Sequence, residues 1–203
     1  MKKLLLASSF EKFADKLDTI PHPALSSLNV VCIPTAAYGE EEWDWLPRDM
    51  APVQKRAKTF REFNIAGQSP ADVRQALQGA DVIYVTGGNT YYLLEQAQKC
   101  DFKGALKEAM NTGATYFGTC AGTILVCPRI DFIADMDNVA KATLTEFNGL
   151  GLVDFLVMPH TDNEGYGPVV KRLTAELKAK HETVIGLRDD QALYIHGNYI
   201  EVF

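Results

Sequence analysis

The sequence predicts an α/β protein with a mostly parallel central sheet, helices on both faces of the sheet and a C-terminal β-hairpin. Short apolar runs alternate along the chain with stretches that space apolar residues three and four positions apart, as amphipathic helices do. The runs are apolar almost throughout, which is typical of strands buried on both faces. The last two runs are separated by Gly197-Asn198, a hairpin turn signal.

The alternation predicts the residue range of each strand and helix. The parallel strands are expected at residues 3–7, 29–33, 81–85, 115–118, 154–158 and 183–187. The hairpin is expected to join residues 192–196 to residues 199–203. Helices are expected at residues 10–17, 40–61, 70–78, 90–100 and 169–181. No repeat or linker interrupts the order, so a single domain over residues 1–203 is expected.

The composition of the chain argues against several classes of binding partner. The chain has 203 residues, is 47% hydrophobic and carries a net charge of −6. It has no cluster of Lys and Arg and no apolar run long enough to span a membrane, so neither nucleic acid nor a membrane is an expected partner. The four cysteines lack metal-ligand or disulfide-framework spacing, which indicates a cytoplasmic protein without a metal. Both a monomer and a homodimer remain open.

The most informative segment is the strand that runs into Gly118-x-Cys120-x-Gly122. This is the nucleophile-elbow pattern, with cysteine where serine is the commoner residue. The two glycines allow so sharp a strand-to-helix turn because a side chain at either position would crowd its neighbours. The helix that follows points free N–H groups at the sulfur and favours its thiolate. The alternative interpretation is a buried core cysteine.

A cysteine nucleophile needs a base, and His160 is the one histidine that directly follows a predicted apolar strand. Ligands of parallel sheets bind beyond the carboxyl ends of the strands, which is where this residue falls. An acid must then orient the imidazole. Asp189, just past another strand, and Asp162, two residues after His160, are both candidates, and Asp190 is a weaker one.

An oxyanion intermediate needs two N–H donors. The backbone of Ala121, directly after the cysteine, is one candidate. Gly87-Gly88 follows another strand and can supply the second, because glycine lets the main chain approach a ligand closely. The alternative for Gly87-Gly88-Asn89-Thr90 is a phosphate cradle, although the lysine of a P-loop is missing.

Four segments together resemble peptidase E, the aspartyl dipeptidase family. They are Pro34-Thr35-Ala36, the run from Tyr84 to Thr90, Gly118-x-Cys120-Ala121-Gly122 and Pro159-His160. The resemblance extends over nearly the whole chain. It implies a three-layer α/β/α fold related to class I glutamine amidotransferases. It also implies serine-type hydrolysis of peptides without a cofactor, with a preference for an N-terminal aspartate in the best-known members.

The resemblance also assigns residues. Cys120 takes the place of the nucleophilic serine, His160 that of the base and Asp189 that of the acid. Gly88 and Ala121 take the oxyanion-hole positions. Cys120 departs from the family, which has serine at this position. Cysteine at this elbow is typical of the related glutamine amidotransferases.

Three further residues are candidates for binding the substrate: Asp135, Asn89 and Asp162. Asp135 matches an acidic position that lies near the bound amino group in aspartyl dipeptidases. No arginine in the segment 161–167 is available to receive a substrate aspartate.

Several functions therefore compete. The first is a cysteine-nucleophile hydrolase of the peptidase E type, acting on a small peptide or an amino-acid amide. The second is a glutaminase module. Cys120 favours it, as does Asp162, which follows His160 by two residues as a glutamate follows the histidine of the glutamine amidotransferases. The third is a redox-sensing or ligand-binding homologue without catalysis. A serine peptidase changed to cysteine at position 120 would give the same pattern.

Overall fold

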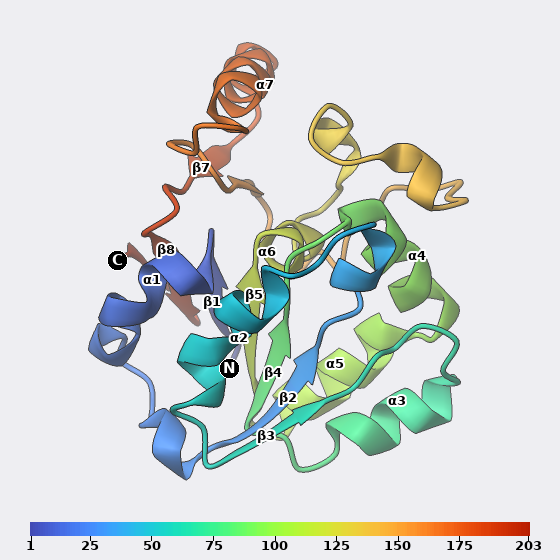
Figure 1. The fold of residues 1–203 in the computed structure, drawn as a ribbon, viewed down its shortest axis with the longest axis vertical. Coiled ribbons are helices and arrows are strands. Elements are labelled where there is room, and N and C mark those ends of the chain that lie inside the picture. Colours follow the sequence, from blue (N-terminus) through green and yellow to red (C-terminus); the bar gives the residue numbers. More distant parts are fainter.

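The computed structural model describes all 203 residues and confirms an α/β fold with a mostly parallel central sheet. Seven strands pair in the order β3-β2-β4-β5-β1-β8-β9 (Figure 1). Their bounds are β1 (Lys3–Ala7), β2 (Asn29–Ile33), β3 (Thr59–Glu62), β4 (Val82–Val85), β5 (Thr115–Thr119), β8 (Ala192–His196) and β9 (Tyr199–Val202). The first five are parallel, and β8 and β9 form the expected antiparallel hairpin beside β1.

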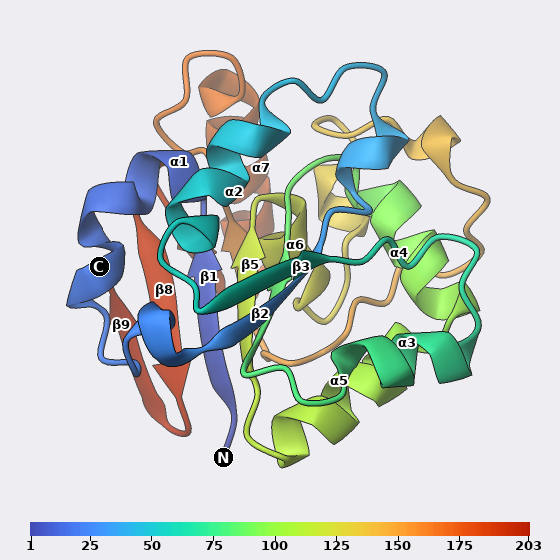
Figure 2. The ribbon, with the colours of Figure 1, turned by 60° about the horizontal axis from the view of Figure 1, so that its bottom comes forward.

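Helices cover both faces of the sheet. Successive strand residues point to opposite sides, so strands that are apolar throughout give the sheet two apolar faces to bury. Leu5 and Ala7 of β1 pack with α1 (Phe10–Phe13) and α2 (Leu46–Gln54) on one face. Leu4 and Leu6 belong to the larger core on the other face. That face carries α3 (Pro70–Leu77), α4 (Thr90–Lys99), α5 (Phe102–Asn111) and α6 (Ala121–Leu125). Figure 2 shows the two groups of helices on either side of the sheet.

None of the helices combines the length and the apolar character that crossing a bilayer requires.

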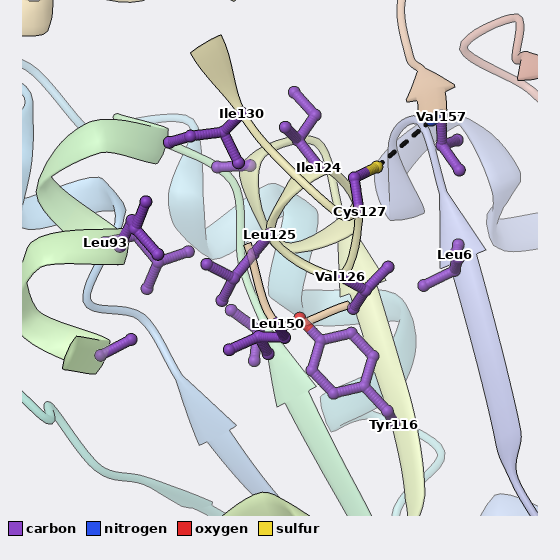
Figure 3. Packing of buried hydrophobic residues seen from close by; sticks show 14 of the residues in the cluster. Leu6, Leu93, Tyr116, Ile124, Leu125, Val126, Cys127, Ile130, Leu150 and Val157 are labelled. Carbon is purple, nitrogen blue, oxygen red and sulfur yellow. Dashed lines mark hydrogen bonds between the residues drawn. The ribbon is translucent and has the colours of Figure 1, made fainter. Parts of the chain in front are cut away.

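The larger core fixes α6 against the sheet. Leu125 and Tyr116 pack together there among other fully buried side chains (Figure 3). The Tyr116 hydroxyl donates a hydrogen bond to the carbonyl of Gly122 over 2.6 Å. At the far end of the helix, the Cys127 sulfur accepts the N–H of Val157 over 3.3 Å, the dashed line in Figure 3. α6 is therefore tied to β5 at its first turn and, just beyond its last residue, to the strand that contains Val157.

Two expected strands do not join the central sheet. β6 (Leu156–Met158) and β7 (Val184–Gly186) pair in parallel with each other, and α7 (Gly167–Ala179) connects them. The expectation that they belong to the central sheet is wrong: β8 takes the place beside β1, and β6 and β7 pair only with each other. Figure 1 shows β7 and α7, orange to red, apart from the central sheet.

The helix expected over residues 40–61 is also wrong. The structure has the shorter α2, followed by the edge strand β3. Pro47 lies in the first turn of α2, where a proline's missing N–H costs nothing. β3 pairs only with β2 and is largely exposed, so it lacks the apolar run that marks the buried strands.

Two other helices differ from expectation. The first is only α1, after which a 3₁₀ segment continues over Ala14–Thr19. α5 was not among the predicted helices, although its buried residues Phe102, Ala105 and Leu106 have helical spacing. Asp101 caps its start by accepting the N–H of Gly104.

Candidate active site

Cys120 occupies the tight turn between β5 and α6. Its backbone has φ 49° and ψ −110°, a conformation that a residue with a side chain rarely adopts. Its N–H donates to the carbonyl of Ala7, the last residue of β1, over 3.2 Å. Such strain, of the order of 1–3 kcal/mol, persists only where the surroundings impose it.

Three glycines make the close approach at this turn feasible. A Cβ at Gly118 would lie 2.7 Å from the carbonyl oxygen of Gly122, and a Cβ at Gly122 would lie 2.2 Å from that of Val85. A Cβ at Gly87 would lie 3.0 Å from the Cβ of Cys120. Any larger residue at the first two positions would push the turn away from the strands. Cys120 itself is only partly buried.

His160 lies two residues beyond β6 and has its ring held by Asp189. Met158 pairs with Gly186 in the small sheet, which brings the two strand ends together. Nδ1 of His160 is 2.6 Å from Oδ1 of Asp189. Because an ionised carboxylate can only accept, Nδ1 carries the proton in this contact. Nε2 is therefore the ring nitrogen left for another partner.

Asp189 is held as an ionised acceptor. Its Oδ1 also accepts the Ser8 hydroxyl over 3.0 Å, and its Oδ2 accepts the Asn163 amide over 2.9 Å. Burial raises the pKa of Asp189, but the hydrogen bonds from His160, Asn163 and Ser8 outweigh it and lower the pKa to about 2. Asp162 acts on Asp189 rather than on the imidazole, because its Oδ1 accepts the N–H of Asp189 over 2.8 Å.

The pKa of His160 reflects both neighbours. Burial lowers it, whereas the negative charge of a Cys120 thiolate and the hydrogen bond and charge of Asp189 raise it, from 6.5 to about 10. The two raising influences dominate, so the imidazole is protonated at neutral pH when the thiolate is present. His160 is therefore held between Asp189 on one side of its ring and Cys120 on the other.

These residues line one cavity of about 320 Å³. Cys120, His160 and Asp189 are in its wall, together with Gly88. The ring of Tyr166 stacks on the His160 ring with 5.4 Å between centroids and forms part of the same wall.

The two expected oxyanion donors are the main-chain N–H groups of Gly88 and Ala121. Gly88 has φ 125°, and a Cβ there would lie 2.2 Å from the main chain of Ala36, so no other residue fits. Its N–H donates no hydrogen bond within the protein. Ala121 is the first residue of α6, so no carbonyl of the helix accepts its N–H.

Two of the candidates for substrate binding lie elsewhere. Asp135 is exposed, pairs with Arg172 and does not line the cavity. Asn89 is fully buried and caps α4: its side-chain oxygen accepts the N–H of Tyr92 and its amide donates to the carbonyl of Asn138. Its side chain is used in the fold rather than presented to a ligand.

Asp190 is not placed to orient His160 either. Its carboxylate pairs with Lys16 over 2.8 Å and with Arg188 over 3.1 Å.

The cavity also contains residues that the sequence did not single out, namely Ser8, Asp137, Asn163 and Tyr166. Ser8 directly follows β1, so the rule that ligands gather beyond strand ends could have identified it. Asp137, Asn163 and Tyr166 lie in irregular segments whose course no periodicity reveals.

Comparisons with known proteins identify the class of this protein. The sequence profile of peptidase family S51 matches residues 4–203. An uncharacterized peptidase of Listeria monocytogenes is 30% identical over 201 residues, which are 98% of this chain and 97% of the relative. Peptidase E of Citrobacter koseri is 35% identical over 140 residues, 66% of this chain and 57% of the relative. These matches define a peptidase, and therefore a hydrolase.

Solved structures agree with this result. A candidate peptidase E from Listeria monocytogenes superimposes with a TM-score of 0.92 at 28% identity, covering 100% of this chain and 98% of that one. A peptidase from an acI-B1 actinobacterium shares the fold, with a TM-score of 0.69 at 17% identity, covering 100% and 87%. The chain belongs to peptidase family S51, and the resemblance to peptidase E is confirmed.

Asp189→Asn is expected to lower the pKa of His160 from about 10, because it removes one of the two negative groups, Cys120 and Asp189, that stabilise the imidazolium. A pKa raised on folding stabilises the protein fully below about pH 6.5, and this contribution is lost as pH rises through about 10. Relative to the wild type, Asp189→Asn should therefore lose more of its free energy of unfolding below about pH 6.5 than above about pH 10. NMR titration of His160 and urea unfolding at several pH values measure both effects. Asp190→Asn is the matched control, and equal titrations in the two variants would contradict the assignment.

Proposed function

We propose that this peptidase cleaves an amide bond of a small peptide, with Cys120 as nucleophile, His160 as acid and base, and Asp189 as the orienting acid. One observation carries the proposal. The Nδ1 side of the His160 ring is committed to Asp189 over 2.6 Å, and the charge of Cys120 acts on the same ring across a shared cavity. A nucleophile, a base and a group that orients the base are the parts that covalent hydrolysis needs.

In the proposed reaction the Cys120 thiolate attacks the carbonyl carbon of the scissile amide. The carbonyl oxygen becomes an oxyanion, for which the N–H groups of Gly88 and Ala121 are the proposed donors. His160 gives its proton to the amide nitrogen, the C–N bond breaks and the amine leaves, with the acyl group on sulfur as a thioester. Water then attacks the thioester while His160 accepts a proton, which releases the acid and restores the thiolate.

The charge of the cavity supports a substrate with a free amino group. Its wall contains five carboxyl groups and one basic side chain other than His160, from Glu11, Glu40, Asp49, Asp137, Asp189 and Lys12. Burial raises the pKa of Asp137, and only the Thr90 N–H, at 2.7 Å from Oδ2, is a main-chain donor to it. An ammonium group beside Asp137 would relieve this cost, so we assign the α-amino group of the peptide to this position.

The same wall gives little support to a preference for N-terminal aspartate, because Lys12 is its one basic side chain besides His160, against five carboxyl groups. Arg129 and Arg172 are engaged in surface ion pairs with Asp131 and Asp135, and neither lines the cavity. Peptides whose first side chain is neutral or basic are the proposed substrates.

Cys120→Ala is expected to lower kcat/KM for the best dipeptide by about a thousandfold or more, because the covalent step is lost. Cys120→Ser should retain more activity than the alanine variant, since a hydroxyl beside His160 can still attack. Hydrolysis of a dipeptide panel, with glutamine and Asp-containing dipeptides included, measures this. Wild-type rates in Cys120→Ala would contradict the proposal, and release of ammonia from glutamine alone would favour the glutaminase instead.

Asp137→Asn is expected to raise KM for dipeptides with a free amino terminus by about 10- to 100-fold, the usual effect of losing one charged hydrogen-bond partner. N-acetylated forms of the same dipeptides should be poor substrates of both enzymes, with little difference between them. Asp135→Asn is the matched control, because that carboxylate lies outside the cavity and pairs with Arg172. Unchanged KM in Asp137→Asn would contradict the assigned amino-group position.

A further inference from the structure

Ser8 is a fully buried hydroxyl at the centre of the site, directly after β1. Its Oγ lies 2.8 Å from the main-chain nitrogen of His160 and 3.0 Å from Oδ1 of Asp189. It is also 3.3 Å from Nδ1 of the imidazole. A single oxygen atom thus contacts both members of the His160–Asp189 pair.

The direction of these hydrogen bonds is fixed by chemistry. The main-chain N–H of His160 can only donate, and the ionised carboxylate of Asp189 can only accept. The Ser8 hydroxyl therefore accepts a hydrogen bond from the N–H of His160 and donates one to Asp189. Asp189 Oδ1 in turn accepts two hydrogen bonds, one from the Ser8 hydroxyl and one from Nδ1–H of His160. Alanine at position 8 would leave the His160 N–H without its acceptor and Oδ1 with one donor fewer.

The backbone of His160 requires such a restraint. Its φ is 65°, in the left-handed region that residues with side chains avoid. The Ser8 oxygen accepts the N–H of this strained residue, while the His160 carbonyl accepts the N–H of Asn163 over 3.2 Å. The backbone conformation of His160 sets the direction of its Cα–Cβ bond, so the orientation of the ring depends on it.

The residue before Ser8 holds the other half of the site. The Ala7 carbonyl accepts the N–H of Cys120 over 3.2 Å and the Thr123 hydroxyl over 2.7 Å. The Ser8 carbonyl accepts the hydroxyl of Thr119, the residue before the cysteine, over 3.3 Å. Two consecutive residues at the end of β1 are thus bound to the turn of Cys120 on one side and to His160 and Asp189 on the other.

We infer that Ser8 is a positioning residue, whose hydroxyl sets the His160–Asp189 pair in register with Cys120. This inference rests on the proposed function for the reaction that it supports. Ser8 acts through His160 and Asp189, and the register matters because His160 comes from the small β6–β7 sheet while Cys120 comes from the central one. Ser8 joins the two sheets at the point where proton transfer takes place.

The test compares Ser8→Ala with Ser8→Thr, which keeps the hydroxyl, and with Ser69→Ala, which removes a hydroxyl that caps α3 instead. We expect kcat for the best dipeptide to fall at least tenfold in Ser8→Ala with KM within twofold of wild type. Ser8→Thr should recover most of kcat, and Ser69→Ala should lose stability without losing kcat. If Ser8→Ala does not fold, Ser8→Cys, with similar volume and a weak S–H donor, replaces it.

A second readout does not depend on hydrolysis. The Nδ1 proton of His160 should give a downfield NMR signal in the wild type that moves upfield or broadens in Ser8→Ala and returns in Ser8→Thr. A folded Ser8→Ala protein with wild-type kcat and an unchanged Nδ1 signal would overturn the inference, as would a fall in kcat without a change in that signal. Were the wild type inactive on every peptide, the proposed function would fail while the NMR comparison still decided the role of Ser8.

Discussion

The hydrogen bond between His160 Nδ1 and Asp189 Oδ1 determines what the rest of the cavity can do. At 2.6 Å, with the carboxylate ionised, it fixes which ring nitrogen carries the proton and leaves Nε2 for Cys120. Without it a buried imidazole would resist protonation, because desolvation disfavours the charged form. The charge of Cys120 and the contact with Asp189 instead raise the pKa of His160 to about 10. The proposed role of His160 as the acid that protonates a leaving amine depends on this raised pKa.

Two residues of the site have strained backbones. Cys120 and His160 both have positive φ, at 49° and 65°. The end of β1 compensates through main-chain hydrogen bonds, because Ala7 accepts from Cys120 and Ser8 accepts from His160. Since β1 lies between β5 and β8, its position is fixed on both edges. The strained residues are thus anchored to a strand that is hydrogen-bonded on both sides.

The sequence predicted the strands and the turn because both leave local signals. Apolar runs identified β1 and β2 to the residue, and the glycine spacing identified the turn at Cys120. Local signals fail where a partner far along the chain decides the structure. β3 is defined by its pairing with β2, and β6 and β7 by their pairing with each other, while β8 takes the place beside β1. Likewise, Asp135 had the expected position along the sequence, but an irregular backbone brings Asp137 into the cavity instead.

The most direct test of the account is the rate at which iodoacetamide alkylates each cysteine at neutral pH. Cys32, Cys100 and Cys127 are buried, so Cys120 should react first, as peptide mapping by mass spectrometry would show. His160→Gln removes the imidazolium partner of the thiolate, and the account predicts that alkylation of Cys120 then slows by about tenfold or more. Equal rates in the wild type and in His160→Gln would contradict the thiolate–imidazolium pair on which the proposed hydrolysis depends.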